Sequence, residues 1–290
     1  MIYKCPKPIA ILLAVYNGEK YLQVQIDSIL AQTNQQWVLY IRDDDSTDST
    51  QQIIFDYCLK YDNIVAVKDK LGNLGCYENF RQLLRVVRSK YYMFSDADDY
   101  WLPEKVQISY DFILKKEEQY PNIPILARCD KIITDSNLDI INDSGWASLK
   151  FNPDIISKFD HIPLHIAGGA SSIFNSNIRE KYCDEKSPFP TAHDGWIALQ
   201  TTRYGGKIFA IHKPLMMYRL HENSTTSTDK TIQTFAGYIK KMVHINSTLK
   251  YHWKFASLMQ TIGYGSKLKY FYYRVVVFLK LMWGRFIYDK

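Results

Sequence analysis

Residues 92–101 read Tyr92-Met93-Phe94-Ser95-Asp96-Ala97-Asp98-Asp99-Tyr100-Trp101, an apolar, strand-like segment followed directly by three carboxylates. In α/β proteins the carboxyl ends of the strands form the edge of the sheet at which ligands bind. Neighbouring carboxylates repel one another unless a cation or solvent relieves the charge, and hard oxygen ligands suit Mg²⁺ or Mn²⁺ held with substrate phosphates. The run therefore predicts a strand that ends in a metal site. An exposed turn rich in Asp is the alternative.

Strands and helices alternate over the first hundred residues. Apolar runs predict strands at 9–15, 37–41, 64–67 and 91–94, and amphipathic spacing predicts helices between them. Such alternation is typical of an α/β fold with a doubly wound, mainly parallel sheet and helices on both faces. Right-handed crossovers then bring the acidic loops 42–48 and 96–99 to one edge.

The second half of the chain is less regular. Short apolar runs favour strands at 125–127 and 132–133, and Gly168-Gly169 precedes another strand-like segment. A helix is expected to begin at His193-Asp194.

Composition excludes several classes of protein. The chain has 290 residues, 47% of them hydrophobic, which is ordinary for one large or two modest globular domains. Its five cysteines are scattered and form no C-x-x-C pair, which argues against a disulfide framework or a zinc site and fits a reducing cytosol. No signal peptide is expected at the N-terminus. No G-x-G-x-x-G follows the first strand, which argues against a dehydrogenase.

The charge is unevenly distributed. Residues 226–290 carry 11 Lys/Arg against 2 Asp/Glu, a net +9, whereas the first 225 residues carry 25 against 28, a net −3. Within 267–288 the basic residues share one arc of a helix and apolar residues fill the opposite arc. This pattern predicts a helix on an anionic membrane surface, with docking on the protein's own domain or on a second subunit as the alternative. Nucleic acid is disfavoured because the basic residues alternate with a wide apolar face.

Seven short motifs occur in a characteristic order. They are Ala14-Val15-Tyr16-Asn17-Gly18, Arg42-Asp43-Asp44-Asp45-Ser46-Thr47-Asp48, Gly72-Asn73-Leu74-Gly75, Ser95-Asp96-Ala97-Asp98-Asp99, Gly168-Gly169, His193-Asp194-Gly195-Trp196 and Tyr218-Arg219-Leu220-His221-Glu222-Asn223-Ser224. Together they resemble the family 2 glycosyltransferases with the GT-A fold. Within the family they are most similar to bacterial rhamnosyl- and galactosyl-type enzymes of surface polysaccharide assembly.

The resemblance implies a division of the chain. Residues 1–225 would form the catalytic domain, with a nucleotide-binding half at 1–100 and an acceptor half at 101–225. Residues 226–290 would form a basic, amphipathic helical extension.

The resemblance also assigns roles to residues. It implies metal ligands at Asp98, Asp96 and His221, and Asp194 as the catalytic base. It implies nucleotide-sugar contacts at Ala14, Tyr16, Asp44, Asn73, Asp96, Ala97 and Asp98. Acceptor contacts are implied at Trp101, His193 and Trp196.

Other interpretations of these residues stay open. Core packing would explain Tyr16 and both tryptophans, a helix N-cap would explain Asp194, and a surface position would explain His221. Asp45 departs from the Gly that the family often has there. Arg81 and Arg219 are expected either at a diphosphate or in ion pairs.

The sequence thus predicts an inverting, Mn²⁺- or Mg²⁺-dependent transfer of a sugar from a UDP- or dTDP-sugar. The expected acceptor is a glycan, lipid-linked, in capsule, O-antigen or cell-wall polysaccharide synthesis. The expected location is the cytoplasmic face of the membrane, and assembly into a homo-oligomer stays open. The alternative is a non-catalytic nucleotide-binding or scaffolding protein whose basic tail docks on membrane. No motif encodes the identity of the sugar.

Overall fold

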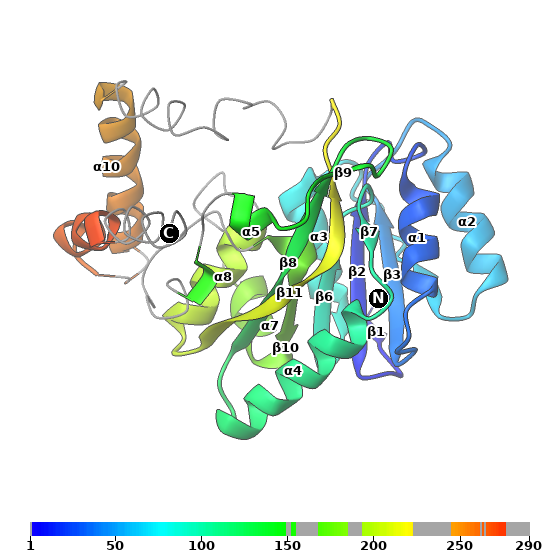
Figure 1. The fold of residues 1–290 in the computed structure, drawn as a ribbon, viewed down its shortest axis with the longest axis horizontal. Coiled ribbons are helices and arrows are strands. Elements are labelled where there is room, and N and C mark those ends of the chain that lie inside the picture. Colours follow the sequence, from blue (N-terminus) through cyan, green and yellow to red (C-terminus); the bar gives the residue numbers. More distant parts are fainter. Residues whose placement is uncertain are drawn as a thin grey trace.

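A nine-stranded sheet forms the centre of the molecule (Figure 1). The structure is a computed structural model that describes residues 2–148, 152–154, 168–184, 193–222, 245–261, 263 and 265–276. Within these residues the strand order is β4-β3-β2-β6-β10-β8-β11-β7, and β9 pairs with β8. The strands are β2 (Ile9–Val15), β3 (Trp37–Asp43), β4 (Ile64–Ala66), β6 (Tyr91–Ser95), β7 (Tyr100–Trp101), β8 (Ile125–Thr134), β9 (Ile140–Asn142), β10 (Ser172–Asn175) and β11 (Lys207–Arg219). A separate small sheet pairs β1 (Tyr3–Lys4) with β5 (Val87–Arg88).

The first half of the large sheet is parallel. β2 lies between β3 and β6, β4 pairs with β3, and all four strands run in one direction. They alternate with α1 (Leu22–Leu30), α2 (Thr50–Lys60) and α3 (Cys76–Val86), as the sequence predicts. Because β3 and β6 both flank β2 in parallel, the acidic loops that follow them lie at the same edge of the sheet. The doubly wound arrangement is confirmed.

The second half makes the sheet mixed. β10 is antiparallel to β6 and β8, whereas β11 is parallel to β8 and antiparallel to β7. The two short strands expected at 125–127 and 132–133 form one strand, β8, across the polar residues between them. Two elements were not predicted, α4 (Lys105–Gln119) and β11. In β11, Pro214 and two irregularities in register with β8 interrupt the strand pattern.

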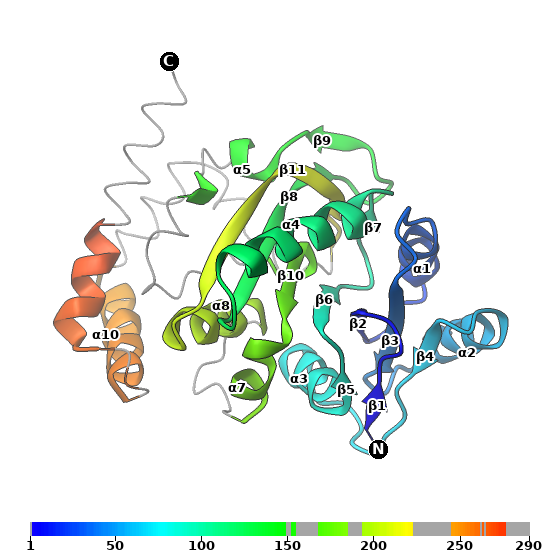
Figure 2. The ribbon, with the colours of Figure 1, turned by 90° about the horizontal axis from the view of Figure 1, so that it is seen from below.

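Two apolar clusters cover the two faces of the sheet. On one face, Leu12 and the residues of β2 that point the same way pack with α3, α7 (Arg179–Asp184) and α8 (His193–Arg203). On the other face, Leu13 and the residues of β2 that point the same way pack with α1, α2 and α4. Figure 2 shows α4 on one side of the sheet and α3 and α7 on the other. Helices therefore lie on both faces, as expected.

Part of the C-terminal extension packs against its own chain. In α10 (Ile245–Thr261), Phe255 and Met259 are buried in the cluster that includes α8, and Tyr270 of the helical segment 267–276 joins them. Within 267–288, Tyr270 packs as the docking alternative expects, whereas residues 277–290 lie outside the described part of the chain. No helix in the described part is both long and apolar enough to cross a membrane.

Candidate active site

The end of β11 is held against the acidic loop that follows β6. His221 Nε2 lies 2.8 Å from Asp98 Oδ2, and Arg219 Nε donates to the Asp98 carbonyl at 2.8 Å. The Arg219 backbone N–H donates to Asp99 Oδ1 at 3.4 Å. The antiparallel pairing of β11 with β7 produces this contact, because β7 begins directly after Asp99. The side chains of Asp98 and His221, to which the family resemblance assigns a metal, are therefore in direct contact.

Asp194 belongs electrostatically to the same cluster. Burial, followed by the carboxylates of Asp98 and Asp194, raises the pKa of Asp96 to about 7. Asp99 is fully buried, and burial together with Asp98 and Asp96 raises its pKa well above the ordinary value. Burial lowers the pKa of Lys131, and the charges of Asp99, Asp194 and Asp96 oppose that effect. The carboxylates that follow β6 and the carboxylate of Asp194 on α8 thus act electrostatically on one another and on Lys131.

The chemistry of these side chains fits a divalent cation shared with a substrate. Among the described residues, no group of three or more His, Cys, Asp or Glu side chains could by itself hold a metal ion. Mg²⁺ usually takes one or two carboxylates and completes its coordination with phosphates and water. Burial and the neighbouring carboxylates raise the pKa of Asp96, and a cation would offset both effects. Asp98 and His221 are the residues that would hold it, with Asp96 beside them.

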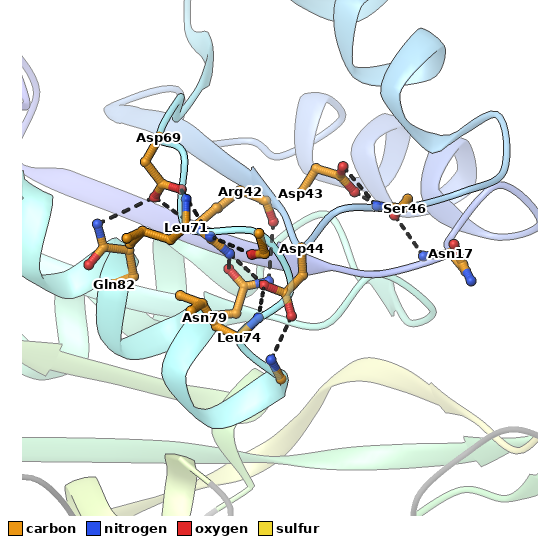
Figure 3. A network of polar contacts seen from close by, with 12 residues as sticks. Asn17, Arg42, Asp43, Asp44, Ser46, Asp69, Leu71, Leu74, Asn79 and Gln82 are labelled. Atoms are coloured by element: carbon orange, nitrogen blue, oxygen red, sulfur yellow. Dashed lines mark hydrogen bonds and ion pairs between the residues drawn. The ribbon is translucent and has the colours of Figure 1, made fainter.

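Asp44 is buried within a polar network at the end of β3 (Figure 3). Its Oδ1 accepts Arg42 Nη1 at 2.6 Å and the Leu74 N–H at 2.8 Å, and its Oδ2 accepts the Gly75 N–H at 2.7 Å. A carboxylate has about four lone-pair positions, so these three bonds leave about one for a ligand. Asp44 therefore organises the loop before α3 and keeps limited capacity to accept a further N–H.

The other residues expected at the nucleotide lie around this edge. Tyr16 is 53% exposed, so it does not take the core-packing alternative. Asn73 is exposed, whereas Ala14 and Ala97 are half-buried. Tyr16 is thus exposed directly after the end of β2.

The departure at Asp45 has a structural reason. Asp45 adopts φ 68°, in the left-handed region that Gly occupies without strain. Asp tolerates this region better than most residues, which explains why the turn forms without Gly.

His193 is part of the core. Its ring stacks on Phe80 with centroids 3.9 Å apart, and burial lowers its pKa to about 4. Gly169 lies directly against it: a Cβ added there would be 2.1 Å from His193 Nε2. Asp194, one residue later, is half-buried, and its Oδ1 accepts the Gly195 N–H at 2.6 Å. His193 therefore anchors the start of α8, and Asp194 lies at the first turn of that helix.

The two tryptophans expected at the acceptor take the core-packing alternative. Trp101 is 0% exposed in the cluster that includes α1 and α4, and Trp196 is 1% exposed in the cluster that includes α3. Neither ring presents a face to a sugar, which corrects that expectation.

Arg81 is buried as well and donates to the Cys183 carbonyl at 2.9 Å, so it does not face a diphosphate.

Several residues of the site were not predicted. Arg42 and Asp69 belong to the Asp44 network, and Lys131 is influenced by the charges of Asp99, Asp194 and Asp96. Lys105 is fully buried and donates to the Ala170 carbonyl at 2.7 Å, beside Gly169. A charged residue within or at the end of an apolar strand, as at Arg42 and Lys131, was the available signal.

The chain is similar to several proteins of known sequence or structure. The glycosyl transferase family 2 model matches residues 10–182. An uncharacterized glycosyltransferase of Methanocaldococcus jannaschii is 28% identical over 96% of this chain and 90% of its own length. A dTDP-rhamnosyl transferase of Shigella flexneri is 27% identical over 73% of this chain and 72% of its own. The fold is similar to S. aureus TarS, solved with UDP-GlcNAc, with a TM-score of 0.58 at 18% identity over 76% of this chain and 60% of that one.

The likeness to TarS shows that the fold is of the GT-A type. The match to the family model, which spans more than half of the chain, specifies the group more closely. The chain belongs to glycosyltransferase family 2.

Proposed function

We propose that this protein is an inverting, metal-dependent glycosyltransferase that uses a UDP- or dTDP-sugar. The observation that carries the proposal is the convergence of Asp98 with His221 at 2.8 Å, in a cluster that the charge of Asp194 reaches. A non-catalytic nucleotide-binding protein has no need of a carboxylate from the acceptor half at that position. The fold supports the proposal, since it carries its acidic loops at the ligand-binding edge.

The nucleotide would lie along the edge formed by β2, β3 and β6. Tyr16 would stack on the base, and Asp44 would accept one ring N–H with its remaining lone pair. Uracil and thymine carry a hydrogen at N3, which suits this acceptor. Ala14, Asn73 and Ala97 would line the ribose and the diphosphate.

The chemistry would divide between two groups of residues. Asp98 and His221, with Asp96 beside them, would hold a divalent cation, which would supply positive charge to the leaving diphosphate. Asp194 would take the proton from the acceptor hydroxyl as that oxygen attacks the anomeric carbon opposite the diphosphate. The position of Asp194 at the start of α8, anchored by His193 against Gly169, would keep the carboxylate aimed at the acceptor.

The acceptor is proposed to be a lipid-linked glycan presented at the cytoplasmic face of the membrane. The Shigella relative is named for rhamnosyl transfer, which is consistent with a surface polysaccharide as product. The C-terminal helices expose Trp253, Leu268, Tyr272 and Val275, and Lys267 places its ammonium 4.6 Å from the Trp253 ring. Apolar side chains interspersed with cations suit an anionic bilayer surface.

A donor panel tests the proposal. UDP-, dTDP- and GDP-sugars, each with Mn²⁺, Mg²⁺ or EDTA, are added to the protein and the thermal midpoint is followed, because a bound donor stabilises the folded state. We expect a UDP- or dTDP-sugar to raise the midpoint only when a cation is present. A protein that responds to no nucleotide sugar would contradict the proposal.

A further inference from the structure

We propose that Arg42 is the positioning residue of the nucleotide site, and that Asp69 orients it. Arg42 would hold Asp44 and the loop 72–75 in the conformation that binds the nucleotide. Donor affinity would then depend on the two ion pairs that join Asp69, Arg42 and Asp44. The inference rests on the proposed function, because it concerns how the same site recognises its nucleotide.

Every N–H of the Arg42 guanidinium has a partner (Figure 3). Nε and one Nη2 hydrogen form a bidentate pair with the two oxygens of Asp69, at 2.9 and 3.0 Å. Nη1 donates to Asp44 Oδ1 and to Asn79 Oδ1, at 2.6 and 3.1 Å, and Nη2 also donates to the Gly72 carbonyl at 3.1 Å. A guanidinium has five such hydrogens, so Arg42 has no donor left for a ligand. Its role is therefore to hold protein groups in place.

The groups that Arg42 holds are those that surround the proposed base site. Asp44 binds the Leu74 and Gly75 backbone N–H groups, and Gly75, at φ 77°, precedes the first residue of α3. Asn79 lies one turn into α3, so Arg42 connects β3, the loop and the helix. Without the guanidinium, Asp44 and Asn79 would each lose the hydrogen bond that connects them to one another through Arg42.

Preorganisation of this kind affects binding more than turnover. A loop that is already ordered in the free protein loses less conformational entropy when the ligand binds. The network lies at the β3 end of the edge, and it includes none of Asp98, His221 and Asp194. Weakening it should therefore raise the donor KM and leave kcat nearly unchanged.

Asp69 offers a way to weaken the network without leaving a buried charge unpaired. Its side chain is 20% exposed, whereas those of Arg42 and Asp44 are each 2% exposed. Asp69→Asn keeps the shape and leaves Arg42 paired with Asp44. Arg42→Lys keeps the charge but loses the planar bidentate fork. Glu104, in a surface ion pair with Lys213 at 2.6 Å, supplies the matched control Glu104→Gln.

The experiment measures binding of UDP and dTDP by calorimetry with Mn²⁺ present, donor KM and kcat, and the thermal midpoint without ligand. We expect Asp69→Asn to raise the nucleotide Kd and the donor KM about tenfold, with kcat within about threefold of wild type. Arg42→Lys should weaken binding further, Asp69→Glu should restore part of the affinity, and Glu104→Gln should match wild type.

Wild-type affinity in both Asp69→Asn and Arg42→Lys, with only the thermal midpoint lowered, would overturn this inference and reduce the network to a structural role. A wild-type protein that binds neither nucleotide would overturn the proposed function as well. The two failures are distinguishable, since one appears only in the variants.

Discussion

His221 Nε2 lies 2.8 Å from Asp98 Oδ2, although the two residues are 123 positions apart in the chain. The contact depends on β11, whose end follows β7 back to the acidic loop. Arg219 reinforces it by donating to the carbonyl of Asp98, so the loop is held through both its backbone and its side chain. The geometry makes β11, and not the acidic loop alone, responsible for the shape of the proposed metal site.

Replacement of Asp194 should separate catalysis from binding. Asp194→Asn removes the proposed base, and general-base contributions are typically about 10²–10⁴-fold in rate. We expect kcat to fall by that order, with the Kd for UDP or dTDP unchanged because the base acts on the acceptor. Single-turnover transfer and calorimetry measure the two quantities, and Glu104→Gln serves as the control. Equal loss of nucleotide affinity would show that Asp194 belongs to the donor site.

Gly169 should not tolerate a side chain. A Cβ there would lie 2.1 Å from His193 Nε2, and the ring is fixed against Phe80. We expect Gly169→Ala to lower the free energy of unfolding by about 1–3 kcal/mol, as overpacking commonly does. In the double variant with His193→Ala the clashing ring is absent. Its loss in free energy of unfolding should therefore be smaller than the sum of the losses in the two single variants. Denaturant titration measures all four proteins, and strict additivity would contradict the contact.

The burial of His193 predicts a pH dependence of stability. Its pKa falls from 6.5 to about 4 in the folded protein, so between these values only the unfolded chain binds the proton. The contribution of His193 to the free energy of unfolding is therefore complete above pH 6.5. It decreases by roughly 3 kcal/mol in total as the pH falls to about 4. Asp96, whose pKa is raised to about 7 in the folded protein, has the opposite effect: its contribution to the free energy of unfolding increases as the pH falls through this range.

The difference between wild type and His193→Gln isolates the histidine. The variant should be less stable at pH 7, and its free energy of unfolding should fall less steeply from pH 6.5 to pH 4. Chemical denaturation at half-unit intervals measures the slopes. Parallel curves would show that His193 is not buried in its neutral form.

The exposed apolar side chains of the C-terminal helices should matter for membrane binding. Leu268 and Tyr272 are 83% and 64% exposed, so Leu268→Glu with Tyr272→Glu leaves the buried Phe255, Met259 and Tyr270 in place. We expect the double variant to be released from phosphatidylglycerol vesicles in a flotation assay. Leu59→Glu, at a position 72% exposed on α2, is the control. Full retention of the double variant would exclude these side chains as the membrane contact.

The sequence predicted the strands and helices of the first half of the fold because the patterns there are local. It did not predict α4 or β11, since apolar and polar residues mix in both and Pro214 interrupts the latter. The rings of Trp101 and Trp196 were placed wrongly for a different reason: burial depends on which elements pack together. Arg42 and Asp69 were missed because their pairing joins residues 27 positions apart.

Transfer by the Asp98→Asn variant tests the central claim most directly. Wild-type protein, Asp98→Asn and His221→Ala are each given a UDP- or dTDP-sugar with Mn²⁺ and with EDTA, and release of the nucleoside diphosphate is followed. Circular dichroism checks that each protein is folded. The account predicts turnover by wild type only with the cation, and a loss of at least about a hundredfold in Asp98→Asn, equivalent to about 2.7 kcal/mol of transition-state stabilisation. Turnover at the wild-type rate by a folded Asp98→Asn protein would contradict it.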